Sequence, residues 1–375
     1  MKKKFSICVM LLLALAFAGC RKNDTGNAGT INEPSPASDN ANLQEADEKN
    51  DDSERKDDVK QNVKLVDFYP FMADVEYVYT GEGNEYAAYR RFTDFISEDG
   101  SRIQIRTNNG ATETVSVIEI KDGKVSVIKK MSECYYRDNV LDAPADDEVE
   151  ILLMEPLVKG TEWTLADGRK RYISGTDVEL NVPLGQYRAL EVTTENSDGI
   201  VKDYYASGIG LIKSQFVSAD YEIISELSKI NENSVYTKSI DIFYPGVDEN
   251  IYVQSIDLSF KTGDVTRKVL SEAIKDTPNE DLLPLASTKT KINSLYLGSD
   301  GIAYIDFSDD FVEEMSVGSG YELLILRCIA NTVGNYYGTD RVYLTVDGKP
   351  YRSGHIEIEE GDTIQVDLNN VIRKN

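Results

Sequence analysis

The chain has 375 residues and carries 40 basic against 65 acidic side chains, a formal charge of −25. This negative charge disfavours electrostatic binding to nucleic acid or to an anionic lipid surface. The single histidine, His355, excludes a histidine-rich zinc site and leaves Ser-His or Cys-His catalysis dependent on one residue. No catalytic constellation is evident. We therefore expect a protein that is not an enzyme and has no cofactor or metal.

The N-terminus has the features of an export signal. Lys2, Lys3 and Lys4 precede an apolar run, Phe5 to Ala18, that is too short for a comfortable membrane-spanning helix. The run ends in Ala18-Gly19-Cys20, which resembles the lipobox of bacterial lipoproteins, although Phe17 departs from its usual pattern. The resemblance implies diacylglyceryl transfer to the Cys20 sulfur and cleavage before Cys20. Palmitate-type acyl chains would then tether the protein to the extracytoplasmic face of the cell membrane. An ordinary cleaved signal peptide is the alternative.

Residues 21–62 differ from the rest of the chain in composition. They contain no aromatic residue and are rich in Asn, Asp, Glu, Ser, Ala, Pro and Lys. Such a segment has little to bury, so we expect a disordered acidic linker. As a flexible coil it would span roughly 35 Å, enough to hold the following domains away from the membrane.

Residues 63–232 have the pattern of a β-rich domain. Alternating segments are separated by turn signals such as Glu98-Asp99-Gly100 and Lys121-Asp122-Gly123. The spacing predicts an antiparallel meander, interrupted by the acidic stretch 138–150. The predicted strands are 75–79, 86–96, 102–106, 114–120, 125–129, 170–173, 177–182, 187–194, 200–206, 211–216 and 221–227. Ser207 to Gly210 favours a hairpin over a phosphate-binding loop, because no helix follows it.

Several short sequence segments in this region resemble an uncharacterised β-rich domain of exported bacterial lipoproteins. The curved sheet of that domain is similar to the half-barrel of lipoprotein carriers. The segments are Phe68-Tyr69-Pro70, Tyr77-Val78-Tyr79, Pro183 to Tyr187 and Tyr204 to Lys213. The resemblance implies a concave face that holds an acyl chain or a peptide, or that is filled by its own side chains. The tyrosines suit either a cell-wall glycan platform or half-buried strand positions. The tyrosines in question are Tyr77, Tyr79, Tyr86, Tyr89, Tyr135, Tyr136, Tyr172, Tyr187, Tyr204 and Tyr205.

After a hinge at Asn231 to Ser234, residues 235–375 mix helices and strands. Strands are predicted at 239–244, 251–260, 292–297, 303–307 and 341–346, with helices at about 264–276 and 321–337. We expect Asp264 to cap the first helix, with Val265, Val269, Leu270, Ala273 and Ile274 on one face. In the second helix we expect Leu323, Leu326, Ile329, Ala330 and Val333 on the buried face. We expect Glu322, Asn331 and Asn335 on other faces, where they can stay in contact with solvent, and Gly338 as the stop.

These elements together resemble the GerM domain of sporulation and spore-germination proteins. The resemblance covers Val265 to Gly348 and is carried by Val269 to Ile274, Gly301 to Ser308, Asp310-Phe311, Gly320-x-Glu322 and Val342 to Gly348. It implies a two-layer α+β unit, similar to the ring-building modules of secretion machines, that associates with similar units.

The remaining candidate residues favour structural roles. Asp306, Asp309, Asp310, Glu313 and Glu314 are numerous enough for a glycoside hydrolase pair, but Asp309-Asp310 stands where a helix would begin. The loop carboxylates Asp142, Asp146, Asp147 and Glu148 lack the spacing of a calcium loop. Cys134 and Cys328 are expected to be small buried hydrophobes, and His355 to be exposed.

The sequence therefore predicts an α+β chain, with a curved antiparallel sheet or half-barrel followed by a GerM-like domain. The leading hypothesis is a lipid-anchored, non-enzymatic scaffold that binds other envelope proteins during sporulation or germination. The alternatives are a lipoprotein whose β domain holds a lipid or cell-wall fragment, and a carboxylate-based hydrolase.

Overall fold

A computed structural model describes residues 64–374. The signal-like segment 1–20, with Cys20, and the predicted linker 21–62 lie outside the described residues. No helix within residues 64–374 has the length and apolarity needed to cross a membrane.

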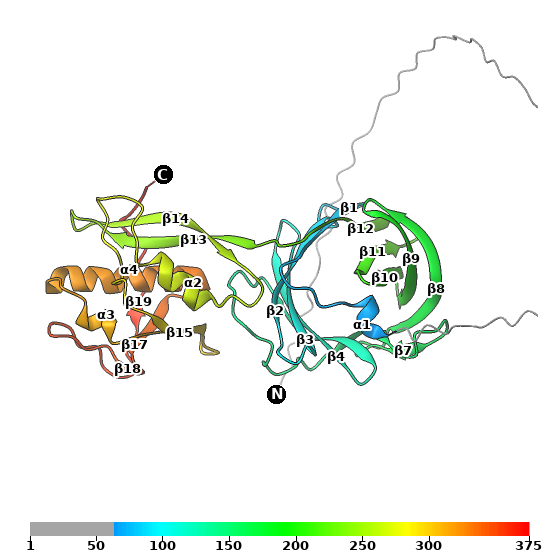
Figure 1. Cartoon of the computed structure of the whole chain (residues 1–375), viewed down its shortest axis with the longest axis horizontal. Coiled ribbons are helices and arrows are strands. Elements are labelled where there is room, and N and C mark those ends of the chain that lie inside the picture. Colours follow the sequence, from blue (N-terminus) through cyan, green and yellow to red (C-terminus); the bar gives the residue numbers. More distant parts are fainter. Residues whose placement is uncertain (1–63, 375) are drawn as a thin grey trace, which may run out of the picture. The chain divides into compact units, whose positions relative to one another are not determined.

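The first part of the described chain is one curved, nearly closed sheet of twelve strands in which every neighbouring pair is antiparallel (Figure 1). In spatial order the strands are β6 (Glu150–Met154), β5 (Lys124–Ser132), β4 (Glu113–Lys121), β3 (Arg102–Asn108), β2 (Tyr89–Ile96), β1 (Glu76–Glu82), β12 (Glu222–Asn231), β11 (Gly210–Val217), β10 (Gly199–Ala206), β9 (Gly185–Asn196), β8 (Lys170–Val182) and β7 (Glu162–Thr164). The predicted antiparallel, curved β-rich domain is confirmed. The short helix α1 (Leu65–Phe68) precedes it.

Three strand assignments differ from the sequence prediction. β6 and β7 were not expected, because five and three residues are too few to establish an alternation. The two strands predicted at 170–173 and 177–182 form one continuous strand, β8, whose register shifts between Ile173 and Val178. Bulges of this kind bend a strand without ending it.

The two end strands of the sheet are linked by side chains. Trp163 Nε1 of β7 donates to Ile151 O of β6 at 3.0 Å, and Arg171 Nη1 of β8 donates to the same carbonyl at 2.9 Å. These bonds occupy a backbone acceptor that an edge strand would otherwise leave free. They explain how the ends of the sheet come together without a backbone ladder between β6 and β7.

The second part is an α+β region with two sheets, as the α+β prediction expected. One sheet contains β13 (Tyr236–Pro245), β14 (Ile251–Phe260) and β20 (Val371–Arg373). The other contains β15 (Ile292–Leu297), β16 (Ala303–Phe307), β17 (Arg341–Val346), β18 (Lys349–Pro350) and β19 (Ile364–Gln365). The helices are α2 (Thr266–Ala273), α3 (Asp310–Glu313) and α4 (Ser319–Tyr337). β16 and β17 are parallel, and α4 provides the crossover between them.

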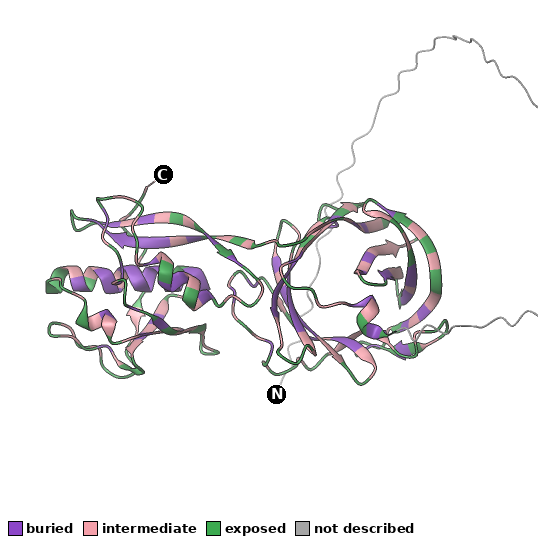
Figure 2. Cartoon of the chain, in the orientation of Figure 1, coloured by how far each residue is buried: buried purple, intermediate pink, exposed green. Residues whose placement is uncertain are grey.

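Helix α4 lies between the two sheets and is mostly buried (Figures 1 and 2). Leu326, Ile329 and Val333 are 1%, 2% and 2% exposed, which confirms the predicted core face. On another face, Thr332 Oγ1 accepts from Phe243 N of β13 at 3.0 Å. The helix therefore packs against two sheets at once.

Three expectations for the faces of this helix are wrong. Glu322 and Asn331 are buried, because the chain beyond β17 covers them. Tyr351 Oη donates to Glu322 Oε1 at 2.8 Å, and Asn331 Nδ2 donates to Asp367 O at 2.8 Å. Leu323, expected on the buried face, is 52% exposed. Asn335 is exposed as predicted, and Gly338 ends the helix in the left-handed region at φ 69°.

The start of α2 also differs from the prediction. Val265 is the N-cap residue and is exposed, and no side chain caps the helix. Asp264 Oδ2 instead accepts from Lys261 N at 2.7 Å, which closes the turn that precedes the helix. Leu270 and Ile274 are buried as predicted, with Val269 and Ala273 partly buried beside them.

Candidate functional site

The outer face of the second sheet carries a row of tyrosines. Ala303, Ile305 and Phe307 of β16 are buried toward the helices, and Tyr304 and Asp306 alternate with them on the opposite face. Tyr304 pairs with Tyr296 of β15 and with Tyr343 of β17. Because paired residues of neighbouring strands share a face, the three rings lie side by side across the sheet.

The three rings make direct contacts. Tyr296 and Tyr304 stack at 5.0 Å with 7° between their planes, and Tyr304 meets Tyr343 at 5.6 Å and 63°. Tyr304 Oη donates to Asp300 Oδ2 at 2.8 Å, and this bond holds the pKa of Asp300 below its usual value. Tyr296 remains 47% exposed. A rigid aromatic row of this kind suits the centre of a protein interface.

The row ends at a strand edge. β15 pairs with β16 alone among the strands of residues 64–374. Helix α2 occupies part of its other side, where Ile292 O accepts from Arg267 Nη1 at 3.1 Å and Ile292 N donates to Ser271 Oγ at 3.4 Å. We call the tyrosine row and this edge together the β15–β17 face.

Three of the clustered carboxylates near this face have clear structural partners. Asp306 Oδ1 accepts from Thr345 Oγ1 at 2.6 Å and from Gly348 N at 2.8 Å. Asp309 is the N-cap of α3 and accepts from Asp310 N at 3.0 Å, as the sequence predicted. Glu314 pairs with Lys289 at 2.6 Å. These contacts stabilise the fold and offer no support for a hydrolase pair.

The other candidate residues are placed as follows. His355 is exposed, and its backbone N donates to Ser353 Oγ at 3.0 Å. Cys134 and Cys328 are free and buried as predicted, and burial raises the pKa of both thiols. Asp146 of the acidic loop accepts from Lys130 N at 2.7 Å. Within residues 64–374, no group of three or more histidine, cysteine or acidic side chains is arranged to hold a metal ion.

The predicted hairpin at Ser207 to Gly210 is confirmed. It joins β10 to β11, and Gly208 and Gly210 adopt φ values of 78° and 98°. Gly208 N donates to Asp67 O at 2.6 Å, so the turn also holds the short helix α1.

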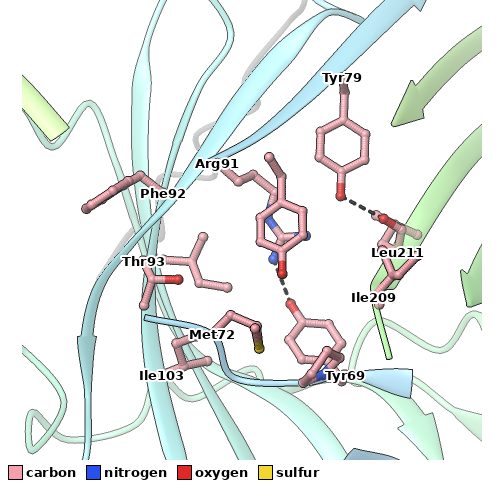
Figure 3. A pocket seen from close by; sticks show the side chains of 13 residues that line it. Tyr69, Met72, Tyr79, Arg91, Phe92, Thr93, Ile103, Ile209 and Leu211 are labelled. Atoms are coloured by element: carbon pink, nitrogen blue, oxygen red, sulfur yellow. Dashed lines mark hydrogen bonds between the residues drawn. The ribbon is translucent and has the colours of Figure 1, made fainter. Parts of the chain in front are cut away.

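The inside of the curved sheet is lined by aromatic and apolar side chains (Figure 3). Tyr79, only 3% exposed, stacks on Tyr89 at 4.3 Å, and its hydroxyl donates to Leu211 O at 2.7 Å. Burial raises the pKa of Tyr79 to about 12. These rings pack against one another, as expected for tyrosines that have a structural role on strands and do not form a glycan platform. Tyr86 and Tyr135 are 50% and 48% exposed.

Arg91 of β2 also lies in this interior. Its Nη2 donates to Tyr69 Oη at 2.8 Å, and the two side chains lie together in Figure 3. A cavity of about 30 Å³ lies on one side of this pair, and a second of about 250 Å³ also borders Arg91 and Tyr69. The first has room for little more than a water molecule. The concave face is therefore filled in one place and hollow in another.

Arg91 and the tyrosine row were not predicted from the sequence. Alternation along β2 places Arg91 on the same face as Tyr89, and alternation in β15, β16 and β17 places the three tyrosines on one face. Those signals were present in the sequence. The sequence does not show that β15, β16 and β17 pair with one another, and this pairing is what joins the tyrosines into a row.

An α+β region with a helical crossover between parallel strands is thus the class of module that the second part of the chain forms. Residues 241–352 match the Germane family, whose description is sporulation and spore germination. This part of the chain is a Germane, or GerMN, domain. The match begins 24 residues before the resemblance noted from sequence at Val265, and so includes half of β13 and all of β14.

Three solved structures are similar to parts of this chain at low identity. The tandem GerMN domains of the sporulation protein GerM from Bacillus subtilis are 18% identical, with a TM-score of 0.29 over 35% of this chain and 46% of that one. This chain thus spans less than half of the tandem structure. A protein from Bacteroides fragilis, assigned as exported and with a YmcC-like fold, is 12% identical, with a TM-score of 0.26 over 44% of this chain and 99% of that one. A Clostridium perfringens protein assigned as a lipoprotein is 16% identical, with a TM-score of 0.21 over 36% of this chain and 95% of that one. No curated protein matches the chain.

Proposed function

We propose that this protein is a lipid-anchored, non-enzymatic scaffold of the cell envelope that acts in sporulation or spore germination. In this proposal Cys20 carries the lipid, and the Germane domain binds other envelope proteins through the β15–β17 face. The observation that carries the proposal is the row Tyr296, Tyr304 and Tyr343 on the outer face of the sheet, where Tyr296 is 47% exposed. The family match of residues 241–352 supports the cellular process.

These three tyrosines do not belong to the hydrophobic core of the sheet. The core of this sheet is on the other face, where Ala303, Ile305 and Phe307 are at most 2% exposed. The outward rings are therefore not required to fill the core. Tyrosine loses few rotamers on binding and supplies both apolar area and a hydroxyl, so it is frequent among the residues that dominate interface affinity.

The assembly role can be tested with a photo-activatable side chain placed at Tyr296 in living cells that make the protein. We expect a discrete cross-linked partner that disappears when Tyr304→Ser and Tyr343→Ser are added, together with a lower yield of germinating spores. The same probe at Tyr221, 53% exposed on the β11–β12 side of the chain, is the matched control. If the Tyr221 probe captures the same partner, or if the serine variants sporulate and germinate normally, the β15–β17 face is not the binding surface.

Anchoring is tested separately. Cys20→Ala should move the protein from the detergent phase to the aqueous phase, because two acyl chains are needed for stable membrane attachment. The mass of the product must be measured in parallel, since an uncleaved signal would also retain the protein. A cleaved Cys20→Ala protein that still partitions with detergent would show that the lipobox is not the anchor.

A further inference from the structure

Arg91 is the feature of the curved sheet that its own fold does not explain. Its guanidinium lies inside the sheet, where it donates to Tyr69 Oη at 2.8 Å and sits 5.9 Å from the centre of the Tyr69 ring. No carboxylate within residues 64–374 comes within 4 Å of it. Other inward or buried arginines of this sheet are paired: Arg106 with Asp94 at 3.1 Å, and Arg171 with Glu150 at 2.9 Å.

An arginine without an acid partner in such surroundings is costly. Taking a charge out of water is unfavourable unless a counter-charge and hydrogen bonds replace the lost solvent. Tyr69 uses one of five guanidinium donors, and the adjoining cavity leaves the other donors room to meet solvent or a ligand. A planar guanidinium is best satisfied by the two oxygens of a carboxylate or phosphate group.

The space beside Arg91 indicates the chemistry of a ligand that could bind there. The larger cavity, of about 250 Å³, is bordered by Arg91 and by Ile118, Val127 and Leu152. The one acid that lines it, Asp203, accepts from Ser214 Oγ at 2.7 Å and is not paired with Arg91. A cation at one end of an apolar space matches a molecule with an anionic head and a hydrocarbon tail.

We propose that the curved sheet binds a single-chain anionic amphiphile, with its carboxylate or phosphate head on Arg91 and Tyr69 and its tail against Ile118, Val127 and Leu152. The formal charge of −25 makes the head alone a poor ligand, since the surrounding field repels anions. Burial of the tail must therefore supply most of the affinity, and Arg91 the selection for charge. This site is separate from the β15–β17 face and does not depend on the assembly role.

The test is titration calorimetry of the mature, unlipidated chain with dodecanoate and with dodecanoyl lysophosphatidic acid below their critical micelle concentrations, and with dodecanol below its solubility limit. We expect saturable binding of one molecule of an anionic ligand, and dodecanol binding at least tenfold more weakly. Comparison of the dodecanoate and lysophosphatidic acid titrations shows whether the site prefers a carboxylate or a phosphate head. Inorganic phosphate alone should not bind measurably.

Variants make the assignment specific. Arg91→Gln should weaken the preferred anionic ligand at least tenfold and leave dodecanol unchanged. Arg90→Gln is the matched control: Arg90 is the next residue on the strand, its side chain is 68% exposed and lies 3.5 Å from Glu76, and its loss should change nothing. Leu152→Trp should weaken the charged and the neutral ligands alike, because it fills the tail cavity. It also serves as the second test if Arg91→Gln does not fold.

Equal binding of dodecanoate and dodecanol would overturn the proposal, as would anionic binding that survives both Arg91→Gln and Leu152→Trp. Failure of every ligand to bind the folded parent chain would also overturn it. None of these results bears on cross-linking at Tyr296, so the two proposals fail independently.

Discussion

At the scale of single residues, Arg137 and Asp94 join the two parts of the described chain. Asp94 accepts from Arg137 Nε at 3.1 Å and pairs with Arg106 at the same distance, and all three side chains are at most 2% exposed. Arg106 also pairs with Glu113 at 2.9 Å, so two cations meet two anions. Arg137 Nη2 donates to Lys261 O at 3.1 Å, at the end of β14. Each charge is compensated and most donors are used.

Removing one member of this network should be costly. Arg137→Ala leaves Asp94 half compensated in a dry site, and we expect it to lower the free energy of unfolding by about 3–5 kcal/mol. Arg169→Ala removes an exposed pair with Asp167, whose side chains are 40% and 44% exposed, and should cost less than about 1 kcal/mol. Urea unfolding of the mature chain measures both. Similar costs for the two variants would mean that the buried network contributes no more than a surface pair.

Asp138 should make stability depend on pH. Burial raises its pKa from 3.8 to about 6, against the opposing effect of a hydrogen bond from Tyr337 Oη at 2.9 Å. Between about pH 4 and pH 6 the unfolded chain has lost this proton and the native chain has kept it. The native state then binds more protons, so the contribution of Asp138 to stability is greatest below about pH 4 and falls as pH rises through this window.

Asp138→Asn removes this titration and keeps an acceptor for Tyr337. At about 1.4 kcal/mol per pKa unit, the parent should lose about 3 kcal/mol relative to the variant between pH 4 and pH 6. Denaturation midpoints of both proteins across that range give the difference, and titration of the other groups cancels between them. Parallel pH profiles would show that Asp138 is ionised in the native protein throughout.

At the scale of elements, α4 is the best test of the packing. Leu326 is 1% exposed, and Leu326→Ala should cost about 2–5 kcal/mol through lost burial and the cavity left behind. Asn335 is exposed on the same helix, and Asn335→Ala should stay within about 0.5 kcal/mol of neutral. Urea unfolding of both variants provides the comparison. Equal effects would mean that the helix does not pack between the two sheets.

Asn331 extends this test to the side of α4 that the sequence analysis placed in solvent. Its Nδ2 donates to Asp367 O at 2.8 Å, and its Oδ1 accepts from Asp367 N at 2.9 Å. Asn331→Ala leaves both backbone groups without a partner, at an expected cost of about 1–3 kcal/mol. A cost as small as that of Asn335→Ala would show that the segment after β19 is not held against the helix.

At the scale of the whole described chain, several bonds cross the predicted boundary near Glu232. Arg137 N donates to Tyr336 Oη at 2.8 Å, and Thr262 N donates to Asp74 Oδ1 at 2.7 Å. Phe260 is fully buried and Tyr336 is 8% exposed. The Germane region has its own core, but part of its surface is covered by the curved sheet.

We therefore predict that a fragment of residues 235–375 unfolds cooperatively, since its helices and two sheets form a packed unit. Its Tm should lie below that of residues 64–375, because cutting the chain exposes Phe260 and unpairs Tyr336. Calorimetry of the two proteins gives both results. A broad transition for the fragment would show that the curved sheet completes its core, and equal Tm values would show that the bonds across Glu232 add nothing.

The sequence by itself determined most elements of this protein. Period-two alternation located most of the strands, because each strand buries one face and exposes the other to solvent. β15, β16 and β17 match their predicted bounds. Gly338 marked the end of α4, because a left-handed residue there favours glycine. The ordered motifs of the last third indicated the Germane domain. The lipobox at Cys20 remains a prediction.

Only the tertiary structure shows which residues pack against each face of a helix or strand. Periodicity shows which side of α4 is apolar, but it cannot show that the segment after β17 buries the polar Glu322 and Asn331 as well. Nor can it show that the tyrosines of β15, β16 and β17 form one row, or that Arg91 faces a cavity while Arg106 faces Asp94. These facts depend on contacts between residues far apart in the chain, whereas a local pattern records only whether a side chain is covered.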